Sequence, residues 1–209
     1  MSDGLTGRLR EEFKAHGARA LVTAPLRVVR VLGRTRQVWF YTQAASGQAP
    51  TQEVEELTAA DWPGLQTDET FPWRADADAS GRFAAGAQLF SRRDAGRRVA
   101  YGWVTCSPRF LVGELGGWVE FEHPVRWIWD CVTPEAHRGR GHYPQLLREL
   151  VARGGAVQPV IYCTRENVSS QRGIEKAGFL RSFTITERWP TPAFRTGPLP
   201  LKFTYHRAA

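Results

Sequence analysis

The sequence is poor in cysteine and has no long apolar run. Among its 209 residues are three cysteines, Cys106, Cys131 and Cys163, with no CxxC spacing and an odd count, so neither a zinc knuckle nor a disulfide scaffold is indicated. Their neighbours are apolar or strand-like, and we expect the thiols to be reduced and mostly buried. No stretch approaches the roughly 20 apolar residues of a membrane span, and the N-terminus does not have the order of a secretory signal. These absences predict a cytoplasmic protein.

Acidic residues are scarce near the N-terminus. The chain has a net charge of +7, and residues 1–36 hold eight basic and three acidic residues, which leaves the remainder only mildly basic. We interpret residues 1–36 as a basic N-terminal extension and residues 37–209 as one globular domain. Because the extension mixes arginines with apolar residues, peripheral membrane contact or partner docking is an alternative to a solvated tail. No basic groove with interleaved aromatic residues is evident, so no nucleic-acid partner is expected.

Hydrophobic periodicity predicts strands and helices in mixed order, which is typical of an α+β or mixed α/β domain. The expected strands lie at 38–43, 97–107, 113–122, 125–133, 159–164, 180–189 and 199–207, with a proline-rich loop at 190–200. The expected helices lie at 53–62, 76–90, 143–153 and 169–177. The β-α-β-α segment that begins near residue 125 carries the motifs described next.

A glycine-rich turn precedes the helix expected at 143–153. Arg138, Gly139, Arg140 and Gly141 alternate in "HRGRGHYPQLLREL". A strand that leads into such a turn presents unpaired backbone N–H groups at the positive end of the helix dipole. Glycine lets an anion approach the main chain closely, and the arginines add charge. The turn is not a Walker loop, because no Gly-Lys-Ser or Gly-Lys-Thr follows. It therefore predicts an anion-binding site that needs no metal.

A second motif lies about thirty residues further on, in "TRENVSSQRGIEKAGF". Ser169 or Ser170 can cap its short helix, and Gly178 can end it. With these two motifs the chain resembles the GNAT superfamily of N-acetyltransferases. Its coenzyme A loop, Arg/Gln-x-x-Gly-x-Gly/Ala after a strand ending in Val-x-Pro, is matched by Val132, Pro134, Arg138 and Gly141. Its second motif, Asn-x-x-Ala/Ser-x-x-x-Tyr-x-Lys-x-Gly-Phe, is matched by Asn167, Ser170, Lys176, Gly178 and Phe179.

The resemblance covers residues 127–180 strongly and residues 38–206 through the order of the elements. It implies a GNAT-type mixed, mostly antiparallel central sheet that is flanked by helices and splayed at its parallel strand pair. It also implies that acetyl-coenzyme A is the co-substrate, with its pyrophosphate on the backbone of residues 138–143 and its pantetheine paired like an extra strand. The implied cofactor-binding residues are Val132, Thr133, Arg138, Gly139, Arg140, Gly141, His142, Tyr143, Asn167, Ser170 and Lys176.

Two positions depart from the family's pattern. Tyr143 stands where the first motif ends in a small residue, so its ring either points outward or contacts the cofactor. Ile174 occupies the position of the tyrosine that many members use as general acid toward the leaving thiolate. That acid is therefore absent, and Tyr162, Cys163 or solvent is left to substitute for it.

The resemblance implies that an acceptor amine attacks the thioester directly in a ternary complex. The amine must be neutral, and free ammonium groups have a pKa near 10, so a base helps. Glu120 and Glu122 share one face of an alternating segment, and Asp130 lies among strongly apolar neighbours. We take these three carboxylates as candidate bases, with a solvated strand-face carboxylate as the alternative for each.

The acceptor predicted by this mechanism is a small-molecule amine. Trp103, Trp118, Trp127, Trp129 and Tyr101 crowd the middle strands, and most are expected to be core. Some of them could instead line an apolar or sugar-stacking pocket, and the Tyr-Pro after the glycine turn is similar to a bacterial subgroup that suggests an amino sugar. A monomer and a homodimer both remain open. The alternatives are a catalytically silent coenzyme A-binding module and a basic membrane or nucleic-acid adaptor.

Overall fold

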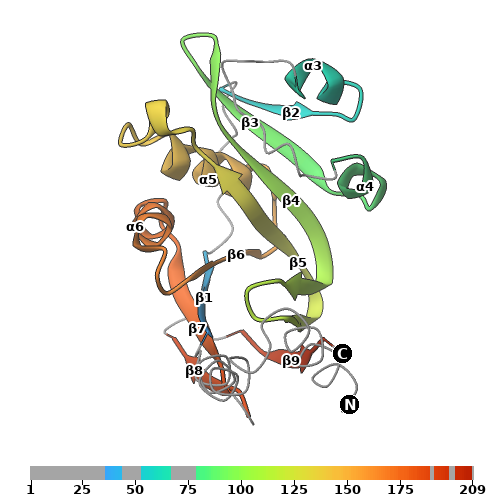
Figure 1. Ribbon diagram of the computed structural model, residues 1–209, viewed down its shortest axis with the longest axis vertical. Coiled ribbons are helices and arrows are strands. Elements are labelled where there is room, and N and C mark those ends of the chain that lie inside the picture. Colours follow the sequence, from blue (N-terminus) through green and yellow to red (C-terminus); the bar gives the residue numbers. More distant parts are fainter. Residues whose placement is uncertain (1–35, 44–52, 67–78, 189–190, 198–200, 209) are drawn as a thin grey trace, which may run out of the picture.

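The structure, a computed structural model, describes residues 36–43, 53–66, 79–188, 191–197 and 201–208 (Figure 1). The predicted extension at 1–36 therefore lies outside the described residues, apart from Arg36. The strands are β1 (Arg36–Thr42), β2 (Val54–Leu57), β3 (Gln88–Asp94), β4 (Arg97–Val112), β5 (Gly117–Val132), β6 (Pro159–Thr164), β7 (Leu180–Glu187), β8 (Ala193–Thr196) and β9 (Phe203–Arg207). The helices are α3 (Trp62–Gln66), α4 (Ala79–Ala84), the short 3-10 helix η1 (Glu135–His137), α5 (His142–Ala152) and α6 (Val168–Lys176).

The nine described strands form one mixed sheet. Their order is β2-β3-β4-β5-β6-β1-β7-β8, and β9 pairs with the N-terminal part of β5. Among these pairs β5 and β6 run parallel, and the others are antiparallel. The predicted fold class, a mostly antiparallel mixed sheet flanked by helices, is confirmed.

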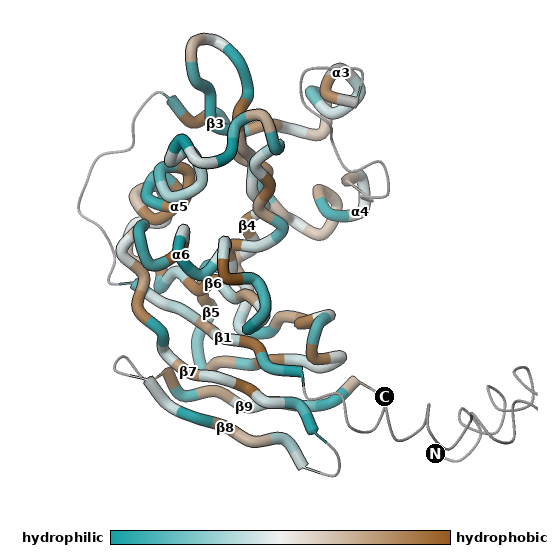
Figure 2. Tube along the Cα trace, turned by 60° about the vertical axis from the view of Figure 1, so that its left-hand side comes forward, coloured by the Kyte–Doolittle hydropathy of each residue, from teal (hydrophilic) through white to brown (hydrophobic). Residues whose placement is uncertain are grey.

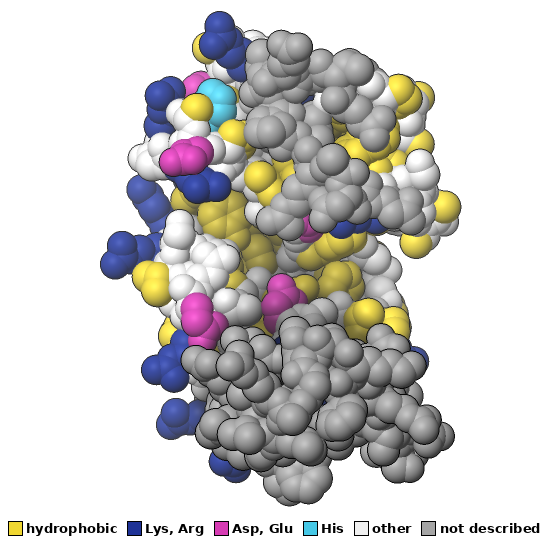
Figure 3. Space-filling model, viewed as in Figure 1, with side chains coloured by type: hydrophobic (Ala, Val, Ile, Leu, Met, Phe, Trp, Pro, Cys, Tyr) yellow, Lys and Arg dark blue, Asp and Glu magenta, His cyan; other side chains and the backbone are white. Residues whose placement is uncertain are grey.

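The sheet splits between β5 and β6. Their parallel pairing has three rungs and ends at Ile128↔Ile161. Beyond this rung β5 stays paired with β4 as far as Val132, and β6 stays paired with β1 as far as Thr164. The two halves of the sheet therefore part here, which is the splayed geometry that the resemblance implies. Figure 3 shows a hollow lined by hydrophobic side chains where the halves meet.

A bulge in β5 accompanies the split. Two residues, Asp130 and Cys131, oppose the single residue Gly102 of β4, where the register shifts. Asp130 has a φ of 45°, in the left-handed region. Gly102 is required opposite, because a Cβ there would lie 2.7 Å from the Cys131 sulfur. An extra residue of this kind bends and twists its strand, so β5 turns away from β6.

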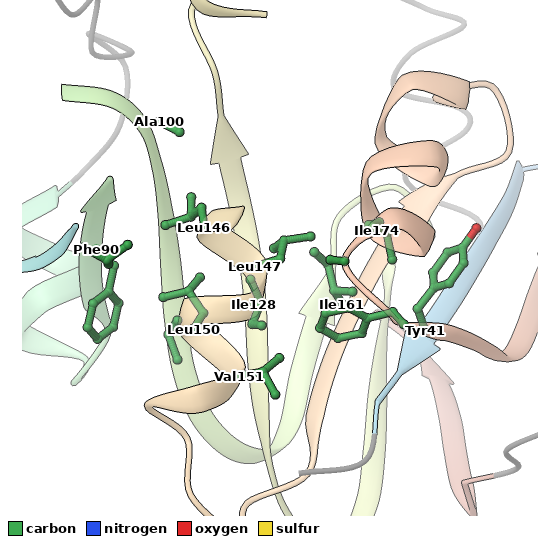
Figure 4. Close-up of a cluster of buried hydrophobic side chains, with 14 of the residues drawn as sticks. Tyr41, Phe90, Ala100, Ile128, Leu146, Leu147, Leu150, Val151, Ile161 and Ile174 are labelled. Carbon is green, nitrogen blue, oxygen red and sulfur yellow. The ribbon is translucent and has the colours of Figure 1, made fainter. Parts of the chain in front are cut away.

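Helices α5 and α6 cover one face of the sheet at the split. The 3.6-residue period of α5 places Leu146, Leu147 and Leu150 on one face, and all three are fully buried against Ile128 and other strand residues (Figure 4). Burial of side chains of this kind contributes roughly 1.5–3 kcal/mol each. In the described part of the chain, no helix has both the length and the apolar character needed to cross a membrane.

Aromatic residues fill the opposite face. Phe40 stacks on Phe183 with ring centroids 4.4 Å apart, and Phe183 stacks on Phe203 at 3.9 Å. Val119 and Phe121, from the N-terminal part of β5, pack into the same cluster. In Figure 2 hydrophobic stretches run along the strands, and the outer turns are mostly hydrophilic. The core is thus divided by the sheet into a helix side and an aromatic side.

The helix predicted at 53–62 is wrong. Residues Val54–Leu57 form the edge strand β2, with both end residues buried, and the helix α3 begins only at Trp62. Local propensity in "EVEEL" favours a helix, but pairing with β3 overrides it. Glu55 then forms ion pairs with Arg93 and Arg98, at 3.1 and 2.7 Å, across the sheet surface.

The other differences also arise from strand pairing. The helix predicted at 76–90 is reduced to α4, and residues from Gln88 onward form β3, while 67–78 lie outside the described residues. The strands predicted on either side of Pro124 are one long strand, β5, and β8 lies within the predicted proline-rich loop. Cys106 is exposed, contrary to the expectation of mostly buried thiols. The remaining predicted strands and helices are confirmed within a few residues.

The core on the helix side gives a direct stability prediction. Leu147→Ala should lower the free energy of unfolding by about 2–5 kcal/mol, because Leu147 is fully buried and its removal leaves a cavity. Leu111→Ala is the matched control, since this side chain is 45% exposed, and should cost well under half of that. Urea denaturation measures both, and equal losses would contradict the assigned core.

Candidate functional site

A cavity of about 500 Å³ opens at the split, on the side of α5 and α6. Three segments line it: the end of β5, the turn into α5 with its first helical residues, and one side of α6. Ten of the eleven predicted cofactor residues lie on its wall, and Arg140 does not. The wall residues that were not predicted to bind the cofactor are Cys131, His137, Pro144, Ser169, Arg172 and Gly173.

The glycine turn has the geometry that an anion site needs. Gly139 and Gly141 have φ values of 76° and 83°, a conformation that costs other residues roughly 1–2 kcal/mol. Gly141 is the N-cap of α5 and supplies no side chain to cap it. His142 and Tyr143, which line the cavity, therefore start the helix without a side-chain cap for their N–H groups, at the positive end of the helix dipole.

The charged side chains around the cavity are all basic. Arg138, Arg172 and Lys176 line it, and no described Asp or Glu does. Arg138 is held in place because its Nε donates a hydrogen bond to the Thr133 carbonyl at 3.0 Å, which ties the turn to the end of β5. Arg172 had no sequence signal beyond its helical spacing from Lys176. The cavity therefore favours a ligand with several negative charges.

Helix α6 is capped differently from the prediction. Neither Ser169 nor Ser170 is the cap; the Asn167 side chain accepts the N–H of Ser170 at 3.1 Å. Asn167 thus orders the first turn of α6 beside the cavity, a common role for this residue type. Gly178, with a φ of 100°, ends the helix as predicted.

Tyr143 neither points outward nor reaches freely into the cavity. Its hydroxyl lies 3.1 Å from the Ser170 hydroxyl, and its ring packs against α6. Burial raises the pKa of Tyr143 well above its usual range, and the neighbouring Cys131 adds to this, so the phenol stays protonated. A Cβ on Gly173 would lie 2.4 Å from the ring. The Tyr143 ring therefore occupies the space that a side chain at position 173 would need.

This fit reverses the usual effect of removing a helical glycine. Gly-to-Ala changes inside a helix normally stabilise it by up to about 1 kcal/mol. Gly173→Ala should instead destabilise the protein by about 1–3 kcal/mol, because the new methyl group overlaps the Tyr143 ring. In a Tyr143→Ala background the same change should become neutral or stabilising. Denaturation of the four proteins in this cycle measures the effect, and an identical penalty in both backgrounds would refute it.

His142 is a buried histidine on the cavity wall. It is 5% exposed, neither ring nitrogen has a hydrogen-bond partner among the described residues, and Nε2 lies 3.8 Å from the Asp94 carboxylate. Burial lowers the pKa of His142, and the Asp94 charge opposes this only in part. The imidazole is therefore neutral at neutral pH and can still donate one hydrogen bond to a ligand.

The lowered pKa of His142 predicts acid sensitivity. Between the folded pKa and the ordinary value near 6.5, the unfolded chain binds more protons, so the stability falls as the pH drops below 6.5. His142→Asn should lose less stability than the wild type between pH 7.5 and pH 5.5 in urea denaturation. His123→Asn, at a position 84% exposed, should keep the wild-type loss. Equal losses in all three proteins would contradict the assignment.

Asp130 is engaged in an ion pair. Its Oδ2 lies 2.6 Å from Arg82 Nη1, and the Arg82 guanidinium lies over the rings of Trp103 and Trp129 at 5.0 and 4.6 Å. The sequence offered no signal for Arg82, because it is 48 residues away. The ion pair ties the bulge of β5 to α4, and the role of Asp130 as base stays a prediction.

The other predicted catalytic residues are separated. Glu120 and Glu122 do share a face, but it is the one opposite Val119 and Phe121, and the Glu122 side chain is 72% exposed. Tyr162 lies on the aromatic side of the sheet, near Phe40. Burial raises the pKa of Tyr162, and the nearby Glu114 charge adds to this. Ile174 is fully buried and fills the core under α6.

Comparisons with known proteins find structural similarity. No family model matches the sequence, and no curated protein matches it. The structure is similar to an acetyltransferase of the GNAT family from Novosphingobium aromaticivorans, with 21% identity, a TM-score of 0.49, and 73% of this chain and 63% of that chain covered. It is also similar to a GNAT-family acetyltransferase from Colwellia psychrerythraea, with 14% identity, a TM-score of 0.48, and 71% and 53% covered.

A third similar structure is an aminoglycoside 6'-N-acetyltransferase from Acinetobacter haemolyticus, with 16% identity, a TM-score of 0.44, and 66% of this chain and 94% of that chain covered. Independently of these structures, the chain has a mostly antiparallel sheet that parts at its parallel pair, β5 and β6, with a glycine turn leading into α5. At these identities and TM-scores the similarity carries no argument about activity, which must be argued from the site.

Proposed function

We propose that this protein is a GNAT acyltransferase that moves an acetyl group from coenzyme A to a primary amine. The observation that carries the proposal is the placement of the glycine turn. Its open helix N-terminus and the basic side chains of α6 border one cavity at the split between β5 and β6. The helix N-terminus and the basic side chains suit the anionic nucleotide of coenzyme A. The split suits its long, narrow thiol arm.

The basic wall supports binding of the nucleotide. The pyrophosphate would lie on the backbone N–H groups that follow Gly141, as anions do at helix N-termini. Arg138, Arg172 and Lys176 would neutralise the remaining charge, and His142 would donate a hydrogen bond. Among the described residues no group of three His, Cys, Asp or Glu could hold a metal, and none of these contacts calls for one.

The split supports placement of the thiol arm. Past Ile128 the backbone of β5 has no further rung to β6, so its polar groups on that side can pair with the amides of the pantetheine as a strand would. The same backbone can polarise the thioester carbonyl and stabilise the oxyanion of the intermediate. A neutral amine then attacks, the C–N bond forms, and the thiolate leaves.

A silent coenzyme A-binding module is the second candidate. One observation favours it: Ile174, fully buried, replaces the tyrosine of the family motif. The thiol of coenzyme A is a far better leaving group than an amine, so transfer can proceed without that acid. Release of free thiol from acetyl-coenzyme A in the presence of an amine panel separates an enzyme from a module that only binds.

A pair of glycine variants tests the cofactor site. Gly141→Trp should abolish coenzyme A binding in calorimetry, because the indole enters the cavity where the phosphates lie. Gly155→Trp is the matched control: Gly155 also has a positive φ, of 59°, and open space around it, but lies past the far end of α5. It should bind coenzyme A as the wild type does. Unchanged affinity in Gly141→Trp would refute the loop assignment.

A further inference from the structure

His142 lies where the cavity, the start of α5 and the end of β3 meet. It is the first residue of α5 and lines the cavity, and its Nε2 lies 3.8 Å from the carboxylate of Asp94, the last residue of β3. Both ring nitrogens are buried, and neither has a hydrogen-bond partner among the described residues. A buried polar ring in this condition is uncommon in proteins. A ligand in the cavity can supply the partner that the ring lacks.

The charged groups around His142 are mostly positive. Arg92 on β3, His137 in η1 and Arg140 in the glycine turn act on the imidazole, and Asp94 is the acidic group beside it. The ring centroid of His137 lies 6.3 Å from that of His142. Burial lowers the pKa of His142, the positive groups add to this, and Asp94 opposes it. The N-terminus of α5 contributes the positive end of a helix dipole, so the imidazole is neutral in the absence of an anion.

A polyanion at the N-terminus of α5 reverses this balance. Phosphate charge offsets the helix dipole and the neighbouring guanidinium groups, so a second proton on the imidazole becomes favourable. The count of N–H groups favours the same result, because a neutral imidazole has one and an imidazolium has two. Only the imidazolium can donate to Asp94 and to a phosphate together. Since His142 borders both Asp94 and the cavity, a bound phosphate favours the charged form.

We propose that His142 and Asp94 form a proton site coupled to the cofactor cavity, so that coenzyme A binds together with a proton. The inference rests on the proposed function, because it takes coenzyme A as the ligand. Solvent supplies the proton, His142 holds it as an imidazolium, and the Asp94 carboxylate accepts one of the two N–H groups. The affinity for coenzyme A therefore rises as the pH falls from about 8 to about 6, the range in which histidine titrates. Release of the cofactor returns the proton to solvent.

Calorimetry of the full chain with coenzyme A, in buffers of different ionisation enthalpy, counts the protons that bind with the cofactor. Near neutral pH the wild type should take up more protons than His142→Asn does. The affinity of the wild type relative to His142→Asn should grow by at least about fivefold between pH 8 and pH 6, a usual size for coupling between two sites. The comparison between the two proteins cancels the protonation of the phosphates themselves. His123→Asn is the control, because its site is 84% exposed, and it should behave as the wild type does.

Two further variants locate the proton. Asp94→Asn removes the carboxylate that holds the imidazolium, and it should reduce the uptake near neutral pH while coenzyme A still binds. The Asp94 side chain is 51% exposed, so the exchange is compatible with folding. His137→Asn should keep most of the uptake, although His137 lines the same cavity. Uptake that is lost in His137→Asn and kept in His142→Asn overturns the inference.

Proton NMR of the imidazole signals gives a test that does not depend on coenzyme A. The signal missing in His142→Asn identifies His142, and its titration is followed with and without inorganic pyrophosphate. We expect pyrophosphate to raise the pKa of His142. An unchanged titration, or equal proton uptake in the wild type and His142→Asn, overturns the coupling. Failure of the wild type to bind coenzyme A would instead overturn the proposed function, and the pyrophosphate titration still decides the proton site in that case.

Discussion

The divergence of β5 from β6 is the constraint on which the rest of this structure depends. Three parallel rungs hold the two halves of the sheet together, and the bulge at Asp130 turns β5 away immediately beyond them. A sheet that parts in this way exposes backbone groups that are normally paired, and proteins rarely leave such groups unsatisfied. The gap can therefore accept an extended ligand that pairs with the free edge of β5. The surrounding elements offer contacts to both ends of that ligand.

The two faces of the sheet differ in character. On the helix side, the glycine turn and α6 gather positive charge around a cavity at the N-terminus of α5. On the other side, aromatic rings pack against one another. Under the proposed function, the anionic part of the ligand would lie on the helix side.

The sequence predicts local features well here and long-range ones poorly. The glycine turn, both long helices and β6 follow from periodicity and capping, because their determinants lie within a few residues. The strand β2 was missed because "EVEEL" favours a helix until β3 is beside it. The partner Arg82 was missed because it contacts the Asp130 carboxylate across 48 residues of chain. The face on which Glu120 and Glu122 lie depends on which side of β5 the aromatic core covers, and alternation alone cannot decide that.

The contact between Tyr143 and Gly173 changes how the cofactor loop should be recognised. The family pattern asks for a small residue at the end of the loop, and this chain has a large one there. The space for the Tyr143 ring comes from α6, where Gly173 has no side chain. In this chain the large residue and the missing side chain belong together, so neither position can be judged without the other.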